Sequence, residues 1–268
     1  MKIGILGVGF VGGTHLKAFE LAKIKVVTHD IKHEGSKIEN LLCCDLVFVG
    51  LPSPTENGRQ DLSIMEAALS SLAALNFKGV LCLKSTVMPG TTNRFRDRFK
   101  LRVVHSPEFL RERCALDDFL FQTTVLVGGP KEDTDIVVDA YQLQRSRLKQ
   151  PRLQTSVHED PCITEMAKYM HNSFLATKVA WANQFADVCE KIRVPYDVVC
   201  EATKTQGGLG LGHLAVPGPD GKRGFSGTCF PKDTLSLVTE YPDMTILAAA
   251  REYNETIRPH DSRCQPII

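Results

Sequence analysis

The chain has 268 residues, 43% hydrophobic and 24% charged, which provides enough apolar material for one large or two modest globular domains. Lysine and arginine number 32 against 31 acidic residues, and this net charge of +1 excludes a field that would attract nucleic acid or an anionic membrane. No apolar run approaches the roughly 18 residues of a membrane span, and Met1 leads straight into a predicted strand, so we expect a cytoplasmic protein without a signal peptide.

A cofactor-binding turn is predicted at the N-terminus. A short buried strand at 2–6 is followed by Gly7-Val8-Gly9-Phe10-Val11-Gly12 and then by a helix-forming run. This G-x-G-x-x-G pattern lets a pyrophosphate approach the backbone, while the helix N-terminus offers unpaired N–H groups to the phosphates. A second strand ends near Asp30, at the spacing where an acidic side chain binds the ribose of adenosine. The pattern predicts NAD rather than NADP, although Lys32 and His33 would tolerate a 2′-phosphate.

Strands and helices alternate through the first half of the chain, as a doubly wound parallel sheet requires. The later predicted strands are 46–49, 80–83, 101–104 and 124–127, the last strand, and the predicted helices after the first are 61–75, 91–99 and 133–148. Loops at the carboxyl ends of the strands hold residues 51–54, 85–90 and 106–109, and ligands bind along that edge of such a sheet. We assign residues 1–155 to a Rossmann-like α/β domain.

Residues 156–268 are predicted to form a smaller, helical domain. One helix spans 161 to about 191 and is apolar on more than one face, and Pro195 opens another. The long helix either forms the core of a homodimer or is buried within one subunit. Lys168 and Asn172 are four residues apart and share a helix face. They either polarise a substrate oxygen or belong to a solvated stripe.

A candidate nucleophile is Cys229, in the segment Gly227-Thr228-Cys229-Phe230-Pro231-Lys232-Asp233. Pro231 suits the first turn of a helix, so Cys229 would lie just ahead of the positive end of that helix. This field, together with Lys232, favours the thiolate, and the glycine-rich segment before it lets a substrate approach. The alternative is a buried, inert cysteine beside a helix cap. The nine cysteines show no zinc spacing, and their odd number argues against a disulfide framework, so we expect no metal site.

Taken in chain order, these motifs resemble those of the UDP-glucose and GDP-mannose dehydrogenase family over nearly the whole sequence. The matching segments are Gly7 to Gly12 with Asp30, Pro52 to Pro54, Lys84 to Thr86 with Pro89 to Thr91, Ser106 to Glu112, Lys168 with Asn172, and Gly227 to Asp233. The resemblance implies oxidation of the C6 alcohol of a nucleotide sugar to a carboxylate, with two NAD molecules and a covalent thioester.

The resemblance also implies a role for each matching side chain near the reacting carbon. Cys229 would capture the intermediate aldehyde as a thiohemiacetal, whose oxidation gives the thioester. Lys168 and Asn172 would stabilise oxyanions, and Lys168 would act as a base in the first step. Asp233 and Thr86 would position a water molecule or tune Lys168.

Two acidic residues and a set of cofactor contacts complete the implied site. Glu112 would activate the hydrolytic water, and Glu108 matches a further acidic site residue. The positions that match cofactor contacts beyond the glycine-rich turn are Ser53, Thr86, Glu112 and Lys232. Ser53 replaces the family's usual threonine and keeps its hydroxyl. Alternatively, Ser53 and Thr86 are turn or cap residues, and Glu108 and Glu112 form an exposed helix face with Arg111 and Arg113.

The chain departs from the family pattern in two places. Full-length members continue into a third, Rossmann-like domain that binds the nucleotide, and this chain ends soon after Arg258, so we expect that domain to be absent. The loop at 205–210 lacks an arginine that the family uses to reach the substrate of a neighbouring subunit. How the nucleotide base of the substrate is recognised is therefore open, and three alternatives remain: another chain completes the site, the affinity is low, or the substrate is smaller.

Two other functions fit the same residues. One is two-electron oxidation as in the β-hydroxyacid dehydrogenases, which share the NAD domain and a helical Lys-x-x-x-Asn pair but need neither Cys229 nor Glu112. The other is a non-catalytic NAD-binding or dimerisation module. Counting the NADH formed per product separates these functions from the four-electron oxidation of a sugar nucleotide.

Overall fold

The computed structural model describes residues 1–205, 207, 210 and 212–258, and the chain divides into two compact units. The first unit comprises Met1–Ser53 and Gln60–Lys168, and the second comprises Pro54–Arg59 and Tyr169–Ile268. The sequence-based boundary lies between residues 155 and 156, whereas the units change after Lys168. The difference arises because the first turns of the long helix pack with the first unit.

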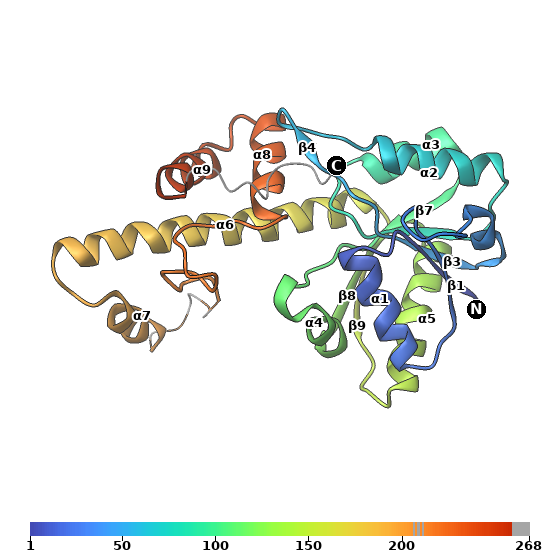
Figure 1. Ribbon diagram of the computed structural model, residues 1–268, viewed down its shortest axis with the longest axis horizontal. Helices are drawn as coiled ribbons and strands as arrows, with labels where there is room; N and C mark the ends of the chain where they lie inside the picture. Colours follow the sequence, from blue (N-terminus) through green and yellow to red (C-terminus); the bar gives the residue numbers. More distant parts are fainter. Residues whose placement is uncertain (206, 208–209, 211, 259–268) are drawn as a thin grey trace. The chain divides into compact units, whose positions relative to one another are not determined.

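The first unit is built on a seven-stranded sheet with the order β2-β1-β3-β6-β7-β8-β9 (Figure 1). Its strands are β1 Ile3–Leu6, β2 Val26–His29, β3 Leu46–Val49, β6 Val80–Leu83, β7 Arg102–His105, β8 Thr124–Gly128 and β9 Gln154–His158. The first five strands run parallel, β8 is antiparallel to β7, and β9 is parallel to β8. The predicted Rossmann-like α/β fold is confirmed, with a mixed sheet at one edge.

The prediction that 124–127 is the last strand was wrong, because β9 follows it. The sequence of β9, Gln-Thr-Ser-Val-His, lacks an apolar run, and its residues are exposed or half-buried. A strand of this kind forms by pairing along β8, which supplies the hydrogen bonds that its own side chains do not predict.

Helices cover both faces of the sheet and give the first unit two apolar layers (Figure 1). Helices α1 Phe10–Leu21, α4 Ala115–Phe121 and α5 Lys131–Arg147 cover one face, and α2 Ser63–Ala74 and α3 Thr91–Phe99 cover the other. Successive strand residues point to opposite layers: Phe48 packs with α1 and α5, whereas Val47 packs with α2. Two short 3-10 helices, η1 Ile38–Cys43 and η2 Glu112–Cys114, connect these elements.

The second unit is helical. It contains most of α6 Pro161–Lys191, with α7 Tyr196–Lys204, α8 Phe230–Glu240 and α9 Thr245–Ile257, and part of a short ribbon of β4 Thr55–Glu56 and β5 Arg59–Gln60. The long helix has the predicted limits, and α7 and α8 begin where Pro195 and Cys229 indicated. Helices α4 and α9 were not predicted. Within the described part of the chain, no helix is both long and apolar enough to cross a membrane.

Candidate active site

The glycine-rich turn joins β1 to α1 at the carboxyl edge of the sheet. Gly7 has a φ of +86°, and a Cβ at Gly12 would lie 1.9 Å from the carbonyl oxygen of Gly7, so the turn requires glycine at both positions. A Cβ at Gly9 would meet no atom of the described residues within 4 Å. The backbone is therefore open at the N-terminus of α1, where a phosphate binds in this kind of turn.

Asp30 lies beside this turn, just after β2. Its carboxylate accepts hydrogen bonds from the backbone N–H of Val8 at 2.7 Å and of Lys32 at 2.9 Å. Partial burial acts to raise the pKa of Asp30, but these bonds outweigh it and hold the pKa below its ordinary value. Asp30 is therefore an anion at neutral pH. The open turn, the helix N-terminus and this carboxylate fit a dinucleotide with free ribose hydroxyls.

The loops after β3 and β6 are tied to each other at Thr86. The Ser53 hydroxyl donates to the Thr86 carbonyl at 2.8 Å, and the Gln60 amide donates to the same carbonyl at 3.0 Å. The Gln60 side-chain oxygen also accepts from the N–H of Met88 at 2.9 Å. Ser53 therefore fixes the backbone of the loop that presents Thr86. Thr86 itself is half-buried.

Glu108 lies in a buried cluster of polar side chains between β6, β7, α1 and α5. Its carboxylate is 2.7 Å from the Lys84 ammonium and 3.1 Å from Nε2 of His15. Lys84 also donates to the Ser106 hydroxyl at 3.0 Å and to the Tyr141 hydroxyl at 2.8 Å. Burial acts to raise the pKa of Glu108, but Lys84 and His15 lower it to about 2. Glu108 is therefore an internal anion, and it does not lie on an exposed helix face.

Glu112 and Lys168 occupy different surroundings in the first unit. Glu112 is exposed at the start of η2, in a segment that an ion pair of 2.6 Å between Arg111 and Asp118 folds back on itself. Lys168 is buried, and its ammonium lies 4.9 Å from the centre of the Phe109 ring. The lysine thus reaches the loop that follows β7. Its burial, and that of Asn172, exclude a solvated stripe.

In the second unit, Cys229 caps the N-terminus of α8. It is exposed, Pro231 lies in the first turn, and the N–H of Asp233 donates to the Cys229 carbonyl at 2.9 Å. The alternative of a buried cysteine is therefore wrong, and the reactivity of the thiol stays a prediction. The thiol stands at the end of the helix where backbone N–H groups are unpaired and the dipole is positive.

Asp233, one turn further along α8, contacts two other predicted site residues. Its carboxylate accepts from the Asn172 amide at 2.6 Å and lies 2.5 Å from the Lys232 ammonium. Asp233 is 1% exposed, so these contacts compensate its charge. Nδ1 of His171 lies 3.1 Å from the Asn172 oxygen. The amide of Asn172 is thus held from both ends, with its nitrogen facing Asp233.

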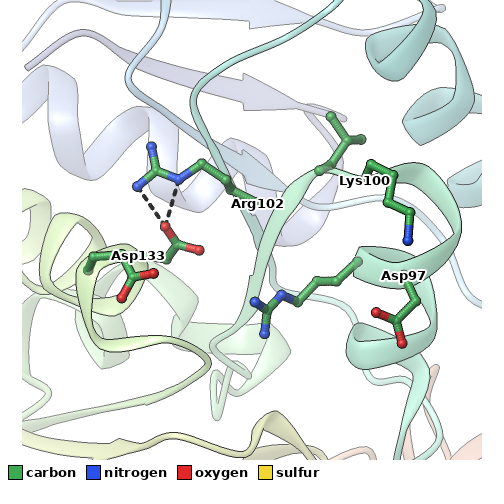
Figure 2. Close-up of a pocket in the computed structure, with 7 residues that line it drawn as sticks. Asp97, Lys100, Arg102 and Asp133 are labelled. Carbon is green, nitrogen blue, oxygen red and sulfur yellow. Dashed lines mark hydrogen bonds and ion pairs between the residues drawn. The ribbon is translucent and has the colours of Figure 1, made fainter.

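A hollow on the opposite edge of the sheet contains none of the predicted site residues (Figure 2). It has a volume of about 500 Å³ and is lined by Arg96, Asp97, Lys100, Leu101, Arg102, Glu132 and Asp133. Arg102 forms a 2.6 Å ion pair with Asp133 at the amino end of β7. Ligands of doubly wound sheets bind at the carboxyl edge, so this hollow is not the candidate site.

Sequence reasoning gave no role to Lys84, His15 and Tyr141. Lys84 directly follows the apolar strand β6, and that position signals a buried ammonium that needs a partner. The partners come from β7, α1 and α5, far away in the sequence, so the motif alone does not identify them. The predicted lack of an arginine at 205–210 concerns a loop in which 206, 208 and 209 lie outside the described residues.

Comparison with known proteins identifies both units. Residues 34–143 match the model of the NAD binding domain of the UDP-glucose/GDP-mannose dehydrogenase family, and residues 163–256 match that of its central domain. UDP-glucose 6-dehydrogenase of Rickettsia bellii (strain RML369-C) is 32% identical over 257 residues, which cover 90% of this chain and 57% of the relative. The enzyme of the same name from Rhizobium meliloti (strain 1021) is 32% identical over 284 residues, covering 98% and 59%.

A solved structure shows the same fold. A UDP-glucose dehydrogenase from the hyperthermophilic archaeon Pyrobaculum islandicum aligns with a TM-score of 0.83 and 26% identity, over 95% of this chain and 68% of that one. The chain spans less than three fifths of the length of the two curated relatives, at 57% and 59%. The family match to the first domain begins after the glycine-rich turn and Asp30, whose geometry independently fits NAD. The chain therefore belongs to the UDP-glucose/GDP-mannose dehydrogenase family, with the NAD-binding domain in its first unit.

Proposed function

We propose that this protein oxidises the C6 primary alcohol of a nucleotide sugar such as UDP-glucose to the uronic acid through a thioester on Cys229. The observation that carries this proposal is the exposed thiol at the N-terminus of α8, one turn before a buried carboxylate that holds the Asn172 amide. An accessible sulfur in the field of a helix N-terminus is suited to nucleophilic catalysis. The names of the relatives support the substrate class.

The first oxidation converts the alcohol to an aldehyde. Lys168, as the neutral amine, takes the hydroxyl proton while a hydride leaves C6. Lys168 is buried beside the Phe109 ring, so bulk water has little access to its side-chain nitrogen. NAD, when bound, supplies the hydride acceptor for each of the two oxidations.

The second oxidation takes place on the cysteine. The Cys229 thiolate adds to the aldehyde carbon, a C–S bond forms, and the second N–H of the Asn172 amide donates to the resulting oxyanion. Loss of a second hydride restores the carbonyl and leaves a thioester. Water then attacks this carbonyl, the C–S bond breaks, and the thiolate leaves. In total, one alcohol, one water and two NAD give one carboxylate, two NADH and three protons.

Glu112 is the acidic residue that we assign to activation of the hydrolytic water. It is exposed at the start of η2, so its carboxylate has access to solvent. Glu108 is instead enclosed with Lys84 and His15, and its pKa of about 2 makes it a poor proton acceptor at neutral pH. In this proposal Glu108 acts on the site through the loop that it holds, and Asp233 orients Asn172.

The ratio of NADH to product tests the function. Incubation with NAD and UDP-glucose, and separately with GDP-mannose, should give two NADH per uronic acid for the preferred sugar. Cys229→Ala should lower acid formation by a factor on the order of 10³ or more, because the covalent intermediate is lost. Cys229→Ser is the control for the shape of the side chain. One NADH per product, with faster turnover of small 3-hydroxy acids, would instead indicate a two-electron dehydrogenase, and bound NAD without turnover would indicate a binding module.

Substitutions in the glycine-rich turn test the cofactor site separately. Gly9→Ala adds a methyl group where the protein leaves space, so the fold should persist while the Kd for NAD rises about tenfold, equivalent to about 1.4 kcal/mol. Gly13→Ala is the matched control, because its Cβ would lie at an ordinary 3.5 Å from the Val8 carbonyl. Equal Kd values for both variants, measured by fluorescence titration, would contradict this assignment.

We also propose that a second copy of the chain is the partner of α6. Exposed apolar side chains follow one face of the helix at spacings of three, four or seven residues: Met170, Phe174, Trp181, Phe185 and Val188, with Ile192 directly after the helix. Met170 is 73% and Phe174 64% exposed, and monomers rarely expose so many large apolar side chains along one helix. Sedimentation equilibrium should give a dimer for the wild type and a monomer for Phe174→Glu. Glu190→Lys, a charge change off that face, should leave the dimer intact, and a monomeric wild type would refute the proposal.

A further inference from the structure

The first turns of α6 contain a buried carboxylate that the reaction above does not use. Glu165 is 0% exposed, and its carboxylate accepts hydrogen bonds from the N–H of Gly90 at 2.6 Å, the N–H of Thr92 at 2.8 Å and the hydroxyl of Thr92 at 2.6 Å. All three donors belong to the junction between the loop after β6 and helix α3. A side chain of one helix thus binds the start of another.

This contact acts as a helix cap from outside the helix. Helix α3 begins after Gly90, which has a φ of +92° and no side chain to accept its first N–H groups. Those groups need acceptors, and a negative charge at a helix N-terminus is favourable. Glu165 supplies both the acceptor oxygens and the negative charge. The loop from Ser85 to Gly90 is therefore fixed at its far end by Glu165, and near Thr86 by Ser53 and Gln60.

The same turn of α6 is fixed on its other side by the end of the sheet. The Thr164 hydroxyl lies 2.8 Å from Nδ1 of His105, at the end of β7. A Cβ at Gly128 would lie 2.7 Å from the Thr164 hydroxyl oxygen and 2.7 Å from the Cα of Pro161, so β8 and α6 are in close contact. The start of α6 therefore has little freedom to shift along the carboxyl edge.

We propose that Glu165 is a positioning residue that sets where Lys168 stands relative to the loop presenting Thr86. Lys168 follows Glu165 by three residues on α6, so both lie on the same face of the helix about one turn apart. A clamp on Glu165 thus fixes the base of the lysine side chain, while the loop that it clamps carries Thr86. This inference rests on the proposed function, in which Lys168 takes the proton of the substrate alcohol.

The expected signature is a loss of rate rather than of affinity. A small displacement of a proton acceptor lowers the rate of the chemical step but leaves cofactor binding at the glycine-rich turn unchanged. Burial raises the pKa of Glu165 although the hydrogen bonds from Thr92 and Gly90 act to lower it, so ionising this carboxyl group in the folded protein costs free energy. Glu165→Gln removes that charge at nearly constant shape and should melt within a few degrees of the wild type. The side-chain amide of this variant has a single oxygen, however, so it cannot accept from both Gly90 and Thr92 as the two carboxylate oxygens do.

A graded series of variants of the full chain tests this inference. Glu165→Gln should lower kcat with UDP-glucose about tenfold and leave KM and the Kd for NAD within twofold. Thr92→Val, which loses the hydroxyl donor, should lower kcat about threefold, and Thr92→Ser should restore it. Glu132→Gln is the matched control, because Glu132 is an exposed acid in the first turn of α5.

Amide exchange gives a second readout that does not depend on turnover. The N–H groups of Gly90 and Thr92 should exchange at least about tenfold faster in Glu165→Gln than in the wild type or in Glu132→Gln. Unchanged exchange, or a kcat within twofold of the wild type in Glu165→Gln, would overturn the positioning role while leaving the proposed function intact. A wild type without turnover on any sugar nucleotide would overturn the proposed function and this role with it.

Discussion

Each unit of this protein buries an acidic side chain beside a lysine, but the two pairs differ in their access to solvent. In the first unit the side chains of Lys84 and Glu108 are 1% and 9% exposed, and His15 and Tyr141 complete their contacts. In the second unit Asp233 is equally buried, whereas the Lys232 side chain is 25% exposed and the adjacent Cys229 is exposed. The same kind of charge pair therefore lies wholly inside the fold in the first unit and one turn from an exposed thiol in the second.

The difference follows from where the lysine ammonium lies. Lys84 has all three donors engaged, by Glu108, Ser106 and Tyr141, so it has no capacity left for a ligand. Burial acts to lower its pKa, but Glu108 raises it, which keeps the pair ionised. Asp233 instead divides its oxygens between Lys232 and the Asn172 amide, which still has an N–H to donate. We expect the first pair to affect stability and the second to affect rate.

The largest effect is expected from breaking the buried pair on one side. Lys84→Met leaves Glu108 as a buried charge without its ammonium partner and should lower the free energy of unfolding by about 3 to 5 kcal/mol. The double variant Lys84→Met/Glu108→Leu should recover most of this loss, because neither charge remains. Urea denaturation measures both, and a loss below about 1 kcal/mol in the single variant would contradict the structural role of the pair.

The corresponding change in the second unit should act on the rate. Asp233→Asn removes the carboxylate that holds the Asn172 amide and should lower kcat for acid formation by on the order of 10², about 2.7 kcal/mol in the barrier. Asp243→Asn, in the exposed turn after α8, is the control. The comparison fails if Asp233→Asn keeps its rate, or if its kcat falls only in proportion to the fraction of unfolded protein.

The pH dependence of stability sharpens the comparison further. The folded-state pKa of Glu108, about 2, lies below its ordinary value, so its contribution is fully present above about pH 5 and is lost as the pH falls toward 2. Between pH 6 and pH 3 the wild type should lose about 2 kcal/mol that Glu108→Gln does not lose. Denaturation curves of both proteins at both pH values measure this difference. The other carboxyl groups are present in both proteins, so their contributions cancel. Parallel losses in the two proteins would show that Glu108 is not an internal anion.

The smallest effect is expected for Lys232, the half-buried lysine of the second pair. Lys232→Met should lower the free energy of unfolding by clearly less than Lys84→Met does, because water screens the partly exposed ammonium and the Asn172 amide still donates to Asp233. Thermal melting of Lys232→Met beside Lys84→Met gives the direct contrast between the units. If both variants lose similar stability, the distinction between the two pairs is wrong.

Local signals in the sequence predicted much of the fold. The glycine-rich turn, the proline in the first turn of α8 and the long apolar pattern of α6 each depend on a few neighbouring residues, and each structure forms where it was predicted. Elements without such signals were missed: β9 is mostly polar, and α4 is a helix of only seven residues with two aspartates in its first turn. The roles assigned to Cys229, Lys168, Asn172 and Glu112 remain predictions.

The sequence by itself determined the alternation of strands and helices at the start of the chain, the NAD-type turn and the placement of a cysteine at a helix N-terminus, because these depend on residues close together in the chain. Only the tertiary structure decided which carboxylates are free. Glu108 and Glu112 are four residues apart, yet one lies with Lys84 and His15 inside the first unit and the other is exposed. The partner of a buried charge comes from a distant strand or helix, and its identity is fixed by packing rather than by spacing.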